Sequence, residues 1–411
     1  MTHSYPYFEP EFVPLSEFIP PLEACMDNAT SDDFTIIKVD GANKQGILLK
    51  IVQILSDLDL IILKSYISSD GDWFMNVFHV TDHHGHKLND PDLICFIKQF
   101  LNNAQRQNRF LSPAQVKIRH DNIINVNHIA STVLELYFLD RPDIFSDVVA
   151  VLFNLSYAID SGEMWAHNGR VVCIIFIKEQ DTGMPITDRN RYDNLGENLA
   201  SLMKVHHLPK ELWEVRLRNP TSSQIHTERR LHQMLQEYKD YEIGSPPLPV
   251  EGDQLSLSKL MDAERGFGNA NKSNEQFCRP QVSIENWNDR DYLVINVKSQ
   301  DRPKLMFDTI CVLTDIGYDV LDGFVSCHES VAFQEYFVRG MNGHIMLNEI
   351  EKQKVIRSLA AAVERRMSRG IKMEVHTFDR HGLLSVLSRT LQLHNMSFKT
   401  AEFAKDDCLA V

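Results

Sequence analysis

Four segments of the chain repeat one local pattern, and this repeat constrains the fold more than any other feature. Each segment has an apolar run typical of a β-strand, a short polar turn, and a run whose apolar residues recur at helical spacing. The segments are residues 34–58, 133–155, 292–316 and 371–393. Because an amphipathic helix buries its apolar face against another element, each helix is expected to cover a sheet. The repeat therefore predicts a series of similar modules.

The first segment opens a longer unit over residues 34–120. After its helix, strands are expected at Leu60–Ile67 and Trp73–Thr81, followed by a second helix at Pro91–Asn103. A last strand at about Gln115–Arg119 would complete the order βαββαβ. This is the ferredoxin-like arrangement of the α+β class, in which two helices cover one face of an antiparallel sheet.

The chain is expected to divide into four modules and two connecting segments. Residues 1–33 form an extended N-terminal leader lying on the first module, and residues 219–290 form a partly disordered linker with a short helix. The modules are 34–120 (module 1), 132–218 (module 2), 291–370 (module 3) and 371–411 (module 4). Module 4 is incomplete, since the sequence offers it no third strand and no second helix. We expect it to dock on module 3, with residues 371–378 also serving as the last strand of that sheet.

Charge and cysteine content exclude several classes of function. The formal net charge of −14 argues against a sequence-independent grip on nucleic acid and against a polybasic membrane contact. The seven cysteines are scattered and form no CxxC pair, as is typical of reduced thiols in the cytoplasm or the nucleus. No apolar run reaches the roughly 18 residues that a membrane-spanning helix needs.

The repeated turn gives the chain a family resemblance. Residues 66–82, 226–233 and 301–315, together with the order of the four units, resemble the plant ACT-domain-repeat proteins. Those proteins consist of ACT modules similar to the C-terminal modules of the bacterial uridylyltransferase nitrogen sensor. The resemblance covers nearly everything after residue 33, and it implies a regulatory protein that binds an amino acid and has no catalytic activity.

The resemblance also implies where a ligand would lie. In ACT modules that bind amino acids, the effector sits between paired modules, against the turn that joins the first strand to the first helix. A helix N-terminus offers backbone N–H groups to a carboxylate, and glycine lets a ligand approach closely. The residues carried over are Asn43, Gly46 and Ile47 in module 1, and Asp379, Gly382 and Leu383 in module 4. Asp143 and Lys304 replace the glycine in modules 2 and 3, so no ligand is expected there.

The same turns have a purely structural interpretation. In the Asp-Arg-Pro sequence of residues 301–303, the aspartate can cap the following helix, and proline suits a first helical position. The basic stretch Thr227–Arg230 of the linker helix is expected to be a solvated helix face. Four such turns in the same position support the fold strongly and a ligand only moderately.

Other clusters also have plain explanations. His79–His86 contains four histidines and an aspartate, which can ligate zinc or nickel, but no second ligand pair follows at a fixed spacing, so an exposed turn is favoured. Gly266–Ser273 differs by one residue from a phosphate-binding loop, yet Asn271 replaces its second glycine and no strand precedes it. We therefore expect no metal, no cofactor and no catalytic residue.

Three functions remain open. The first is a non-catalytic sensor, in which an amino acid or similar metabolite bound between paired modules changes their packing for a partner protein to read. The second is a ligand-free interaction scaffold, which could also form a homodimer through the edges of its sheets. An enzyme related to nucleotidyltransferases ranks last, because no catalytic signature is present. The sequence leaves the ligand, the partner and the oligomeric state undetermined.

Overall fold

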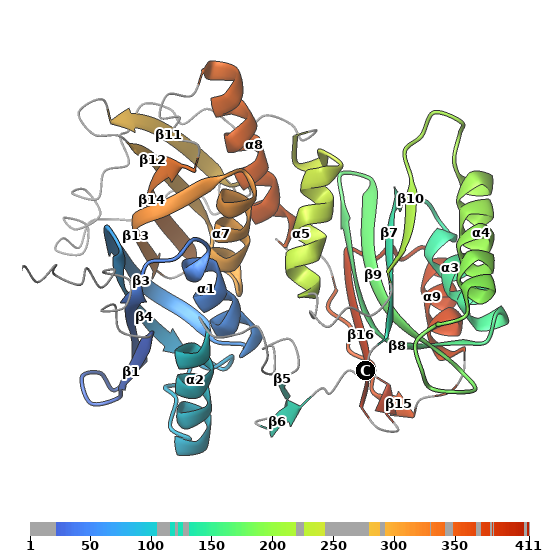
Figure 1. The fold of residues 1–411 in the computed structure, drawn as a ribbon, viewed down its shortest axis with the longest axis horizontal. Coiled ribbons are helices and arrows are strands. Elements are labelled where there is room, and N and C mark those ends of the chain that lie inside the picture. The colour runs from blue at the N-terminus through green and yellow to red at the C-terminus, as the bar shows by residue number, and fades with distance from the viewer. Residues whose placement is uncertain are drawn as a thin grey trace, which may run out of the picture.

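A computed structural model shows two halves, each built from two modules that are not neighbours in sequence (Figure 1). Module 1 pairs with module 3, and module 2 pairs with module 4. The structure describes residues 22–104, 116–119, 122–125, 131–218, 226–242, 279–287, 292–328, 330–341, 348–366, 371–378, 380, 382–406 and 409–410. The α+β fold of antiparallel sheets with helices on one face is confirmed.

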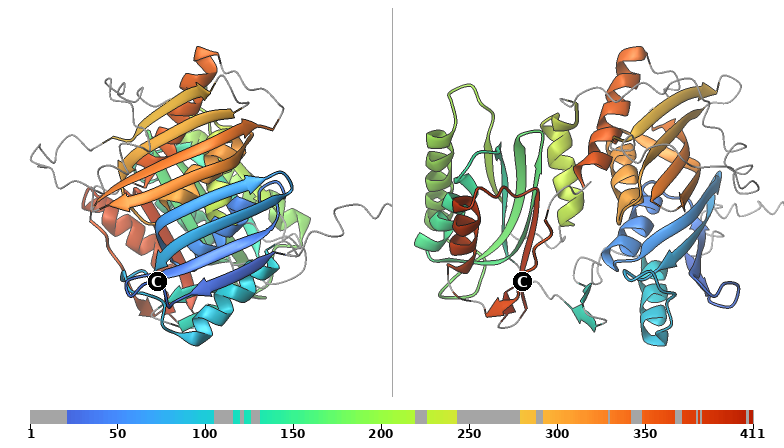
Figure 2. Two further views of the ribbon diagram at one scale, coloured as in Figure 1. Left: turned by 90° about the vertical axis from the view of Figure 1, so that its left-hand side faces the viewer. Right: turned by 180° about the vertical axis from the view of Figure 1, so that it is seen from behind.

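Modules 1 and 3 share one antiparallel sheet, whose open face is seen in Figure 2. Among the described residues it has eight strands, in the order β1-β2-β4-β3-β13-β14-β12-β11. The modules meet where β3 pairs with β13, with Tyr66 opposite Phe324. The elements are β1 (Glu23–Asp27), β2 (Thr35–Ala42), α1 (Ile47–Asp57), β3 (Ile61–Asp70), β4 (Trp73–Thr81), α2 (Pro91–Asn103), β11 (Gln281–Trp287), β12 (Tyr292–Gln300), α7 (Leu305–Asp315), β13 (Tyr318–His328), β14 (Val331–Gly340) and α8 (Glu349–Arg365).

Modules 2 and 4 share the second sheet. In the described part of the chain its order is β10-β7-β9-β8-β16-β17-β15, and the modules meet where β8 pairs with β16. Helices α3 and α9 pack side by side on the same face. The elements are β7 (Thr132–Leu139), α3 (Ile144–Asn154), β8 (Tyr157–His167), β9 (Arg170–Glu179), α4 (Arg189–His206), β10 (Glu214–Arg218), β15 (Thr377–Phe378), α9 (Leu383–Leu393), β16 (Thr400–Asp406) and β17 (Leu409–Ala410).

Glycines allow both joining strands to pack closely. Gly162 is the sixth residue of β8, and Gly323 is the sixth residue of β13. A Cβ atom on Gly162 would lie 2.4 Å from the ring of Phe403 across the joint, and one on Gly323 would lie 3.2 Å from Ile67 across the other joint and 2.9 Å from the ring of Tyr336 within module 3. Glycine in a strand often marks such a close approach. The joint between modules therefore has the same local solution in each half.

The linker supplies a helix that joins the two halves. Helix α5 (Thr227–Glu237) lies between the helices of modules 1 and 3 and the second sheet, followed by the short 3₁₀ turn η3 (Asp240–Glu242) (Figure 1). Its Leu231 and Leu235 are fully buried in a core that includes Trp165 of β8. Arg230 of α5 binds Glu135 of β7 at 2.8 and 2.9 Å. The expectation of a solvated face at Thr227–Arg230 is therefore wrong, since Glu228 and Arg230 are buried.

The outer strands of modules 1 and 3 differ from expectation. Strand β5 (Val116–Arg119) does not close module 1 but pairs with β6 (Asn122–Asn125) in a separate two-stranded sheet. The position beside β2 is taken by β1, which comes from the N-terminal segment. In module 3 the position beside β12 is taken by β11, from the end of the linker. These edge strands precede their modules, whereas β10 is the last element of module 2, as the order βαββαβ requires.

The prediction that module 4 docks on module 3 is wrong. Its strand β16 pairs with β8 of module 2, and its helix α9 contacts α3. The expected strand at residues 371–378 is reduced to Thr377–Phe378, which pairs with β17. The edge that residues 371–378 were to fill in module 3 is already occupied by β11.

No helix among the described residues is long and apolar enough to cross a membrane.

Candidate functional site

The four strand-to-helix turns share one backbone conformation. The residue before the first helix of each module is left-handed, with φ of 77° at Gly46, 70° at Asp143, 59° at Lys304 and 80° at Gly382. Each is followed by a helix of 11 residues. Glycine adopts this conformation freely, whereas other residues are strained by it. Modules 2 and 3 therefore keep the geometry of the turn at a cost in stability.

These four helix starts also differ from the others in how they are capped. In α2, α4, α5 and α8 the residue before the helix accepts a hydrogen bond from a first-turn amide through its side chain. Within the described residues, α1, α3, α7 and α9 have no such bond from their own capping residue. The expectation that the turn aspartates cap these helices is therefore wrong. The first amides of α1 and α9, at Ile47 and Leu383, donate to the turn carbonyls of Lys44 and Arg380 at 3.0 Å, so only the amides that follow them could bind a group from elsewhere.

The first residue of the turn has an anchoring role instead. The backbone N–H of Asn43 donates to Asp72 at 2.6 Å, that of Asp140 to Gly169 at 2.8 Å, and that of Asp301 to Ser330 at 2.8 Å. In each case the acceptor carbonyl lies at the hairpin that follows the second strand of the module. Burial raises the pKa of both Asp140 and Asp301. This position fixes the turn to its own sheet.

The turn of module 1 lies open at the interface with module 3. Gly46 has no atom within 4 Å of the place that a Cβ would take. The side chain of Gln45 reaches Met341 of module 3, with 2.8 Å between Nε2 and Sδ. The amide nitrogen of Asn43 donates to Gly71 at 3.1 Å, so its oxygen is the atom that could accept from an ammonium group. Ile47 is buried and begins the helix.

The turn of module 2 is occupied by a side chain of module 4. The carboxamide of Gln392 donates to Asp143 Oδ1 at 3.2 Å and to Ser146 Oγ at 3.0 Å, and it accepts from the backbone N–H of Asp143 at 3.0 Å. These partners fix the orientation of the amide, since the opposite one would place its oxygen against acceptors. Gln392 thus binds the backbone and side chain of the residue that precedes α3.

The turn of module 3 is covered by helix α5. Lys304 Nζ lies 2.8 Å from Glu228 Oε1, and Arg366 binds the other oxygen of Glu228 at 2.9 Å. Burial opposes the charge of Lys304, but Glu228 more than compensates and holds its pKa above the usual range. The residue that replaces glycine here therefore serves the contact between the two halves.

Behind that turn lies a buried ionic cluster. Asp308 of α7 accepts from Arg365 at 3.0 Å and forms an ion pair with Arg302 at 2.8 Å, and Arg366 with these two cations holds its pKa well below the usual range despite burial. Burial lowers the pKa of His232 to about 4, so the ring is neutral near pH 7. It donates to Asp308 at 2.7 Å and accepts from the Tyr241 hydroxyl at 2.8 Å. The cluster binds α5 and η3 to module 3.

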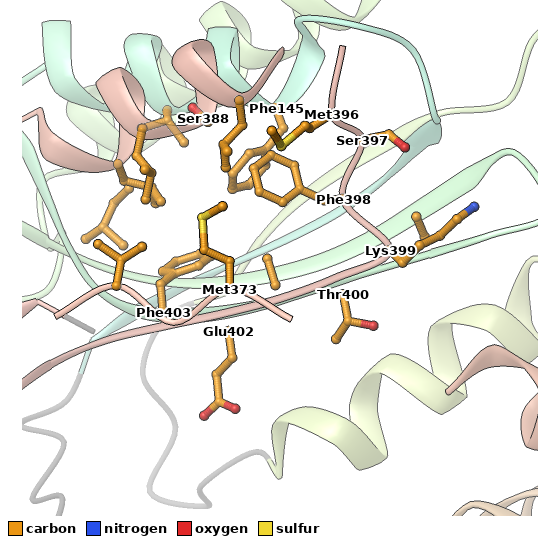
Figure 3. Close-up of a pocket in the computed structure, with 18 of the residues that line it drawn as sticks. Phe145, Met373, Ser388, Met396, Ser397, Phe398, Lys399, Thr400, Glu402 and Phe403 are labelled. Atoms are coloured by element: carbon orange, nitrogen blue, oxygen red, sulfur yellow. The ribbon is translucent and has the colours of Figure 1, made fainter. Parts of the chain in front are cut away.

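The turn of module 4 borders a cavity between modules 2 and 4. Gly382 and Leu383 line it, whereas Asp379 lies outside the described residues. The cavity, here called the α9 cavity, has a volume of about 970 Å³ and is bounded by α3, β8, α9, β16 and residues 371–377. Phe153 of α3 stands against the turn, 2.9 Å from where a Cβ of Gly382 would lie. Figure 3 shows Phe145, Met373, Phe398 and Phe403 around the cavity.

The predicted ligand-binding residues therefore lie at two separate sites. Asn43, Gly46 and Ile47 lie together at the joint of modules 1 and 3, while Gly382 and Leu383 lie at the joint of modules 2 and 4. Sequence reasoning missed Gln392, Glu228 and Phe153. Only Glu228 had a signal, because it belongs to the 226–233 stretch that carried the family resemblance.

The histidine-rich segment carries no metal-like geometry. Asp82 accepts from the backbone N–H groups of His84 and His86 at 2.9 and 2.7 Å, which makes this segment a local turn. Across the described residues, no group of three or more His, Cys, Asp or Glu side chains is arranged to hold a metal ion.

Comparison with known proteins places this architecture in a family. The family model described as the ACR family N-terminal ACT domain matches residues 30–108. The ACT domain-containing protein ACR4 of Arabidopsis thaliana is 37% identical over 392 residues, which cover 95% of this chain and 79% of that protein. The chain belongs to the ACR family of ACT domain-containing proteins.

Two further relatives fit this assignment. The ACT domain-containing protein ACR2 of Arabidopsis thaliana is 35% identical over 412 residues, which cover 97% of this ACR protein and 80% of the relative. The bifunctional uridylyltransferase/uridylyl-removing enzyme of Bradyrhizobium diazoefficiens is 30% identical over 92 residues, which cover 22% of this chain and 10% of that enzyme. The likeness to the uridylyltransferase is thus confined to a short region.

Proposed function

We propose that this ACR protein is a non-catalytic regulator that binds an amino acid or similar small metabolite between modules 1 and 3, and that the bound state is read by a partner protein. The ligand would lie against Asn43, Gly46 and Ile47. The observation that carries the proposal is the open turn at Gly46, which combines a left-handed glycine, unobstructed space and a helix start without a side-chain cap.

The chemistry of the turn suits a zwitterion. The positive end of the α1 dipole and its first-turn amides favour a carboxylate. The Asn43 oxygen can accept from an α-ammonium group. Since Gln45 contacts Met341 of module 3, a ligand here would touch both modules of the pair. Binding would then favour one packing of the pair over another, which is how a ligand shifts a conformational equilibrium.

The test is a screen of the common amino acids on the purified full chain by thermal shift and titration calorimetry. A ligand at about 100 times its Kd should stabilise the folded chain by roughly 2.7 kcal/mol. Absence of both heat and stabilisation across the screen, with the chain folded, would reject the proposal.

Gly46→Asp is the matched variant. Asp143 already adopts the left-handed conformation at the equivalent position, so the fold should tolerate the change. The added carboxylate would repel the ligand carboxylate and abolish the stabilisation. Gly85→Asp is the control, because Gly85 is also left-handed and unobstructed but lies in the local turn after β4. Equal ligand affinity in both variants would place the ligand elsewhere.

A ligand-free scaffold is the second candidate function. It is favoured by the turns of modules 2 and 3, where Gln392 and Glu228 take the place of an external group. Under this alternative all four turns serve packing alone. Partner capture by the full chain that is unaffected by Gly46→Asp, together with an empty ligand screen, would support it.

A further inference from the structure

Helix α9 lacks the burial that its counterparts have. Aligned from their first residues, Leu387, Ser388 and Leu391 of α9 correspond to Val148, Val149 and Leu152 of α3. The three residues of α3 are 0 to 2% exposed. In α9 only Ser388 is buried, while Leu387 and Leu391 are half-buried. The inner face of α9 therefore borders volume that the other modules fill with protein.

The missing burial has a visible cause. Residues 371–376 cross the region without joining a strand, because only Thr377 and Phe378 pair within the sheet. Ile371 is 88% exposed, and Met373 is 52% exposed. The α9 cavity lies between this segment, α9 and β16. Its volume of about 970 Å³ falls at the upper end of the range for small-molecule sites.

The inside of the cavity is apolar. Figure 3 places Phe145 of α3, Met373, Met396, Phe398 and Phe403 around the open space. Phe403 holds its place because Gly162 leaves room for its ring. The Ser388 hydroxyl donates to the carbonyl of Ser385 at 3.1 Å, so it needs no partner from a ligand.

Several charged groups at the border are paired with other residues or extend away from the cavity. Arg365 binds Asp308 and stacks on Trp165, with 3.3 Å from its guanidinium carbon to the ring centroid. Arg366 binds Glu228 at 2.9 Å. The side chains of Lys399 and Glu402 extend away from the cavity in Figure 3. Asp160 also lines the cavity and pairs with Lys178 at 3.0 Å, while Lys372 and Arg380 are exposed. A zwitterion placed among the apolar residues would lose its hydration without gaining partners there, which is costly.

We propose that the α9 cavity binds a neutral, largely apolar small molecule. This site is separate from the Gly46 turn in location and in ligand chemistry, so it goes beyond the amino-acid binding proposed above. The ligand would complete the apolar contacts of Leu387 and Leu391 and hold α9 against α3 and β16.

The experiment uses the full chain and 1-N-phenylnaphthylamine, a neutral apolar fluorophore. The expected result is a saturable rise in fluorescence with one molecule bound per chain. Leu387→Trp fills the cavity and should weaken binding about tenfold or more. Val386→Trp is the control, because Val386 lies on the same helix, is 56% exposed and does not line the cavity. It should leave binding unchanged.

Several results would overturn the proposal. Absence of binding by the folded chain means that the cavity is closed in solution. Binding that Leu387→Trp leaves intact places the fluorophore elsewhere. If light scattering shows that the chain forms a dimer and fluorophore binding is lost at the same time, a second copy of the chain covers the cavity. Ser388→Leu is the second filling variant, should Leu387→Trp fail to fold.

A readout on the unaltered chain makes the test independent of any variant. The bound probe should slow hydrogen exchange in residues 383–393, and exchange that does not change contradicts the proposal. The amino-acid screen is an independent test, since it uses thermal shift and calorimetry with Gly46→Asp as its variant and does not involve the fluorophore.

Discussion

Glu163 of β8 lies directly opposite Glu402 of β16 in the strand pair that joins module 2 to module 4. Like charges in directly opposed positions destabilise an antiparallel pair. Glu163 is buried and accepts from the indole N–H of Trp165 at 2.7 Å. Burial, with Glu228 and Glu402 nearby, raises the pKa of Glu163 to about 7, although Arg366 and Lys304 oppose the shift.

The first prediction is that Glu163 makes stability depend on pH between about 4.5 and 7. In this range the folded chain holds the proton, while the unfolded chain, with the ordinary pKa near 4.5, has released it. The folded state therefore gains stability as pH falls through the window and loses it as pH rises, by up to about 3 kcal/mol. Glu163→Gln keeps the acceptor for Trp165 and should raise the Tm at pH 8 but not at pH 4.5.

The measurement is the Tm of wild type and Glu163→Gln across pH 4.5 to 8. His232 acts in the opposite direction, because burial lowers its pKa to about 4, so its contribution to stability is lost as pH falls from about 6.5 to 4. The difference between the two chains cancels that contribution. Glu402→Gln is the control and should show a smaller shift, since Glu402 is exposed. A difference that does not vary with pH would contradict the prediction.

The second prediction concerns the strained lysine of module 3. Lys304 and Lys239 are both left-handed, with φ of 59° and 56°. Lys239→Gly should stabilise the chain or leave it unchanged, because it relieves roughly 1 kcal/mol of strain at an exposed residue. Lys304→Gly relieves the same strain but removes a partner from buried Glu228, and breaking a buried pair costs about 3–5 kcal/mol. It should therefore destabilise by about 2 kcal/mol or more in urea unfolding.

The two lysine variants are compared in a single series of unfolding curves. Glu228→Gln combined with Lys304→Gly should recover part of the loss, since the buried carboxylate that Lys304→Gly leaves with Arg366 is then replaced by a neutral amide. Equal effects of Lys304→Gly and Lys239→Gly would show that the pair with Glu228 contributes nothing.

The sequence allowed each module to be predicted, but not which modules pair with each other. The helical stripe and the polar turn are local, so α1, α3, α7 and α9 and the strands that precede the first three of them could be predicted from spacing alone. The neighbour of β16 could not, because side-by-side pairing depends on which strand edges remain free after folding. The edge beside β12 is filled by β11, which leaves β8 as the partner of module 4.

The candidate site was predictable to the same extent. Gly46 and Gly382 stood out because the family resemblance places a ligand-contacting glycine there, and both adopt the left-handed conformation. The groups that close the other two turns come from residues distant in sequence, since Gln392 reaches Asp143 and Glu228 reaches Lys304. Local spacing contains no information about such contacts. The α9 cavity was equally hidden, because it results from the absence of a strand.

The third prediction tests the contact between Gln392 and the turn of module 2. Gln392→Ala removes the three hydrogen bonds to Asp143 and Ser146 and should cost about 1 kcal/mol, as the loss of a helix cap does. Gln392→Glu should cost more, because its carboxylate would face Asp143. Hydrogen exchange of residues 144–147 measures the effect, and exchange as slow as in wild type would contradict it. Thr390→Ala, at an exposed position of the same helix, is the control.

The last prediction addresses the joint between modules 2 and 4 through Gly162. A Cβ here would lie 2.4 Å from the ring of Phe403 and 2.8 Å from the carbonyl oxygen of Ile174. The ring can move, but the carbonyl belongs to the neighbouring strand β9, so Gly162→Ala must separate β16 from β8 or distort the sheet. We expect faster hydrogen exchange in residues 400–404 and 383–393, with no change in β3 and β13. Gly196→Ala in helix α4 is the control, because the nearest atom to its added Cβ would be 3.8 Å away, on Leu217 of β10. Alanine should stabilise this helix by about 0.5–1 kcal/mol. Exchange that quickens equally in both halves would mean that the variant unfolds the whole chain and that module 4 is not a separately opening unit.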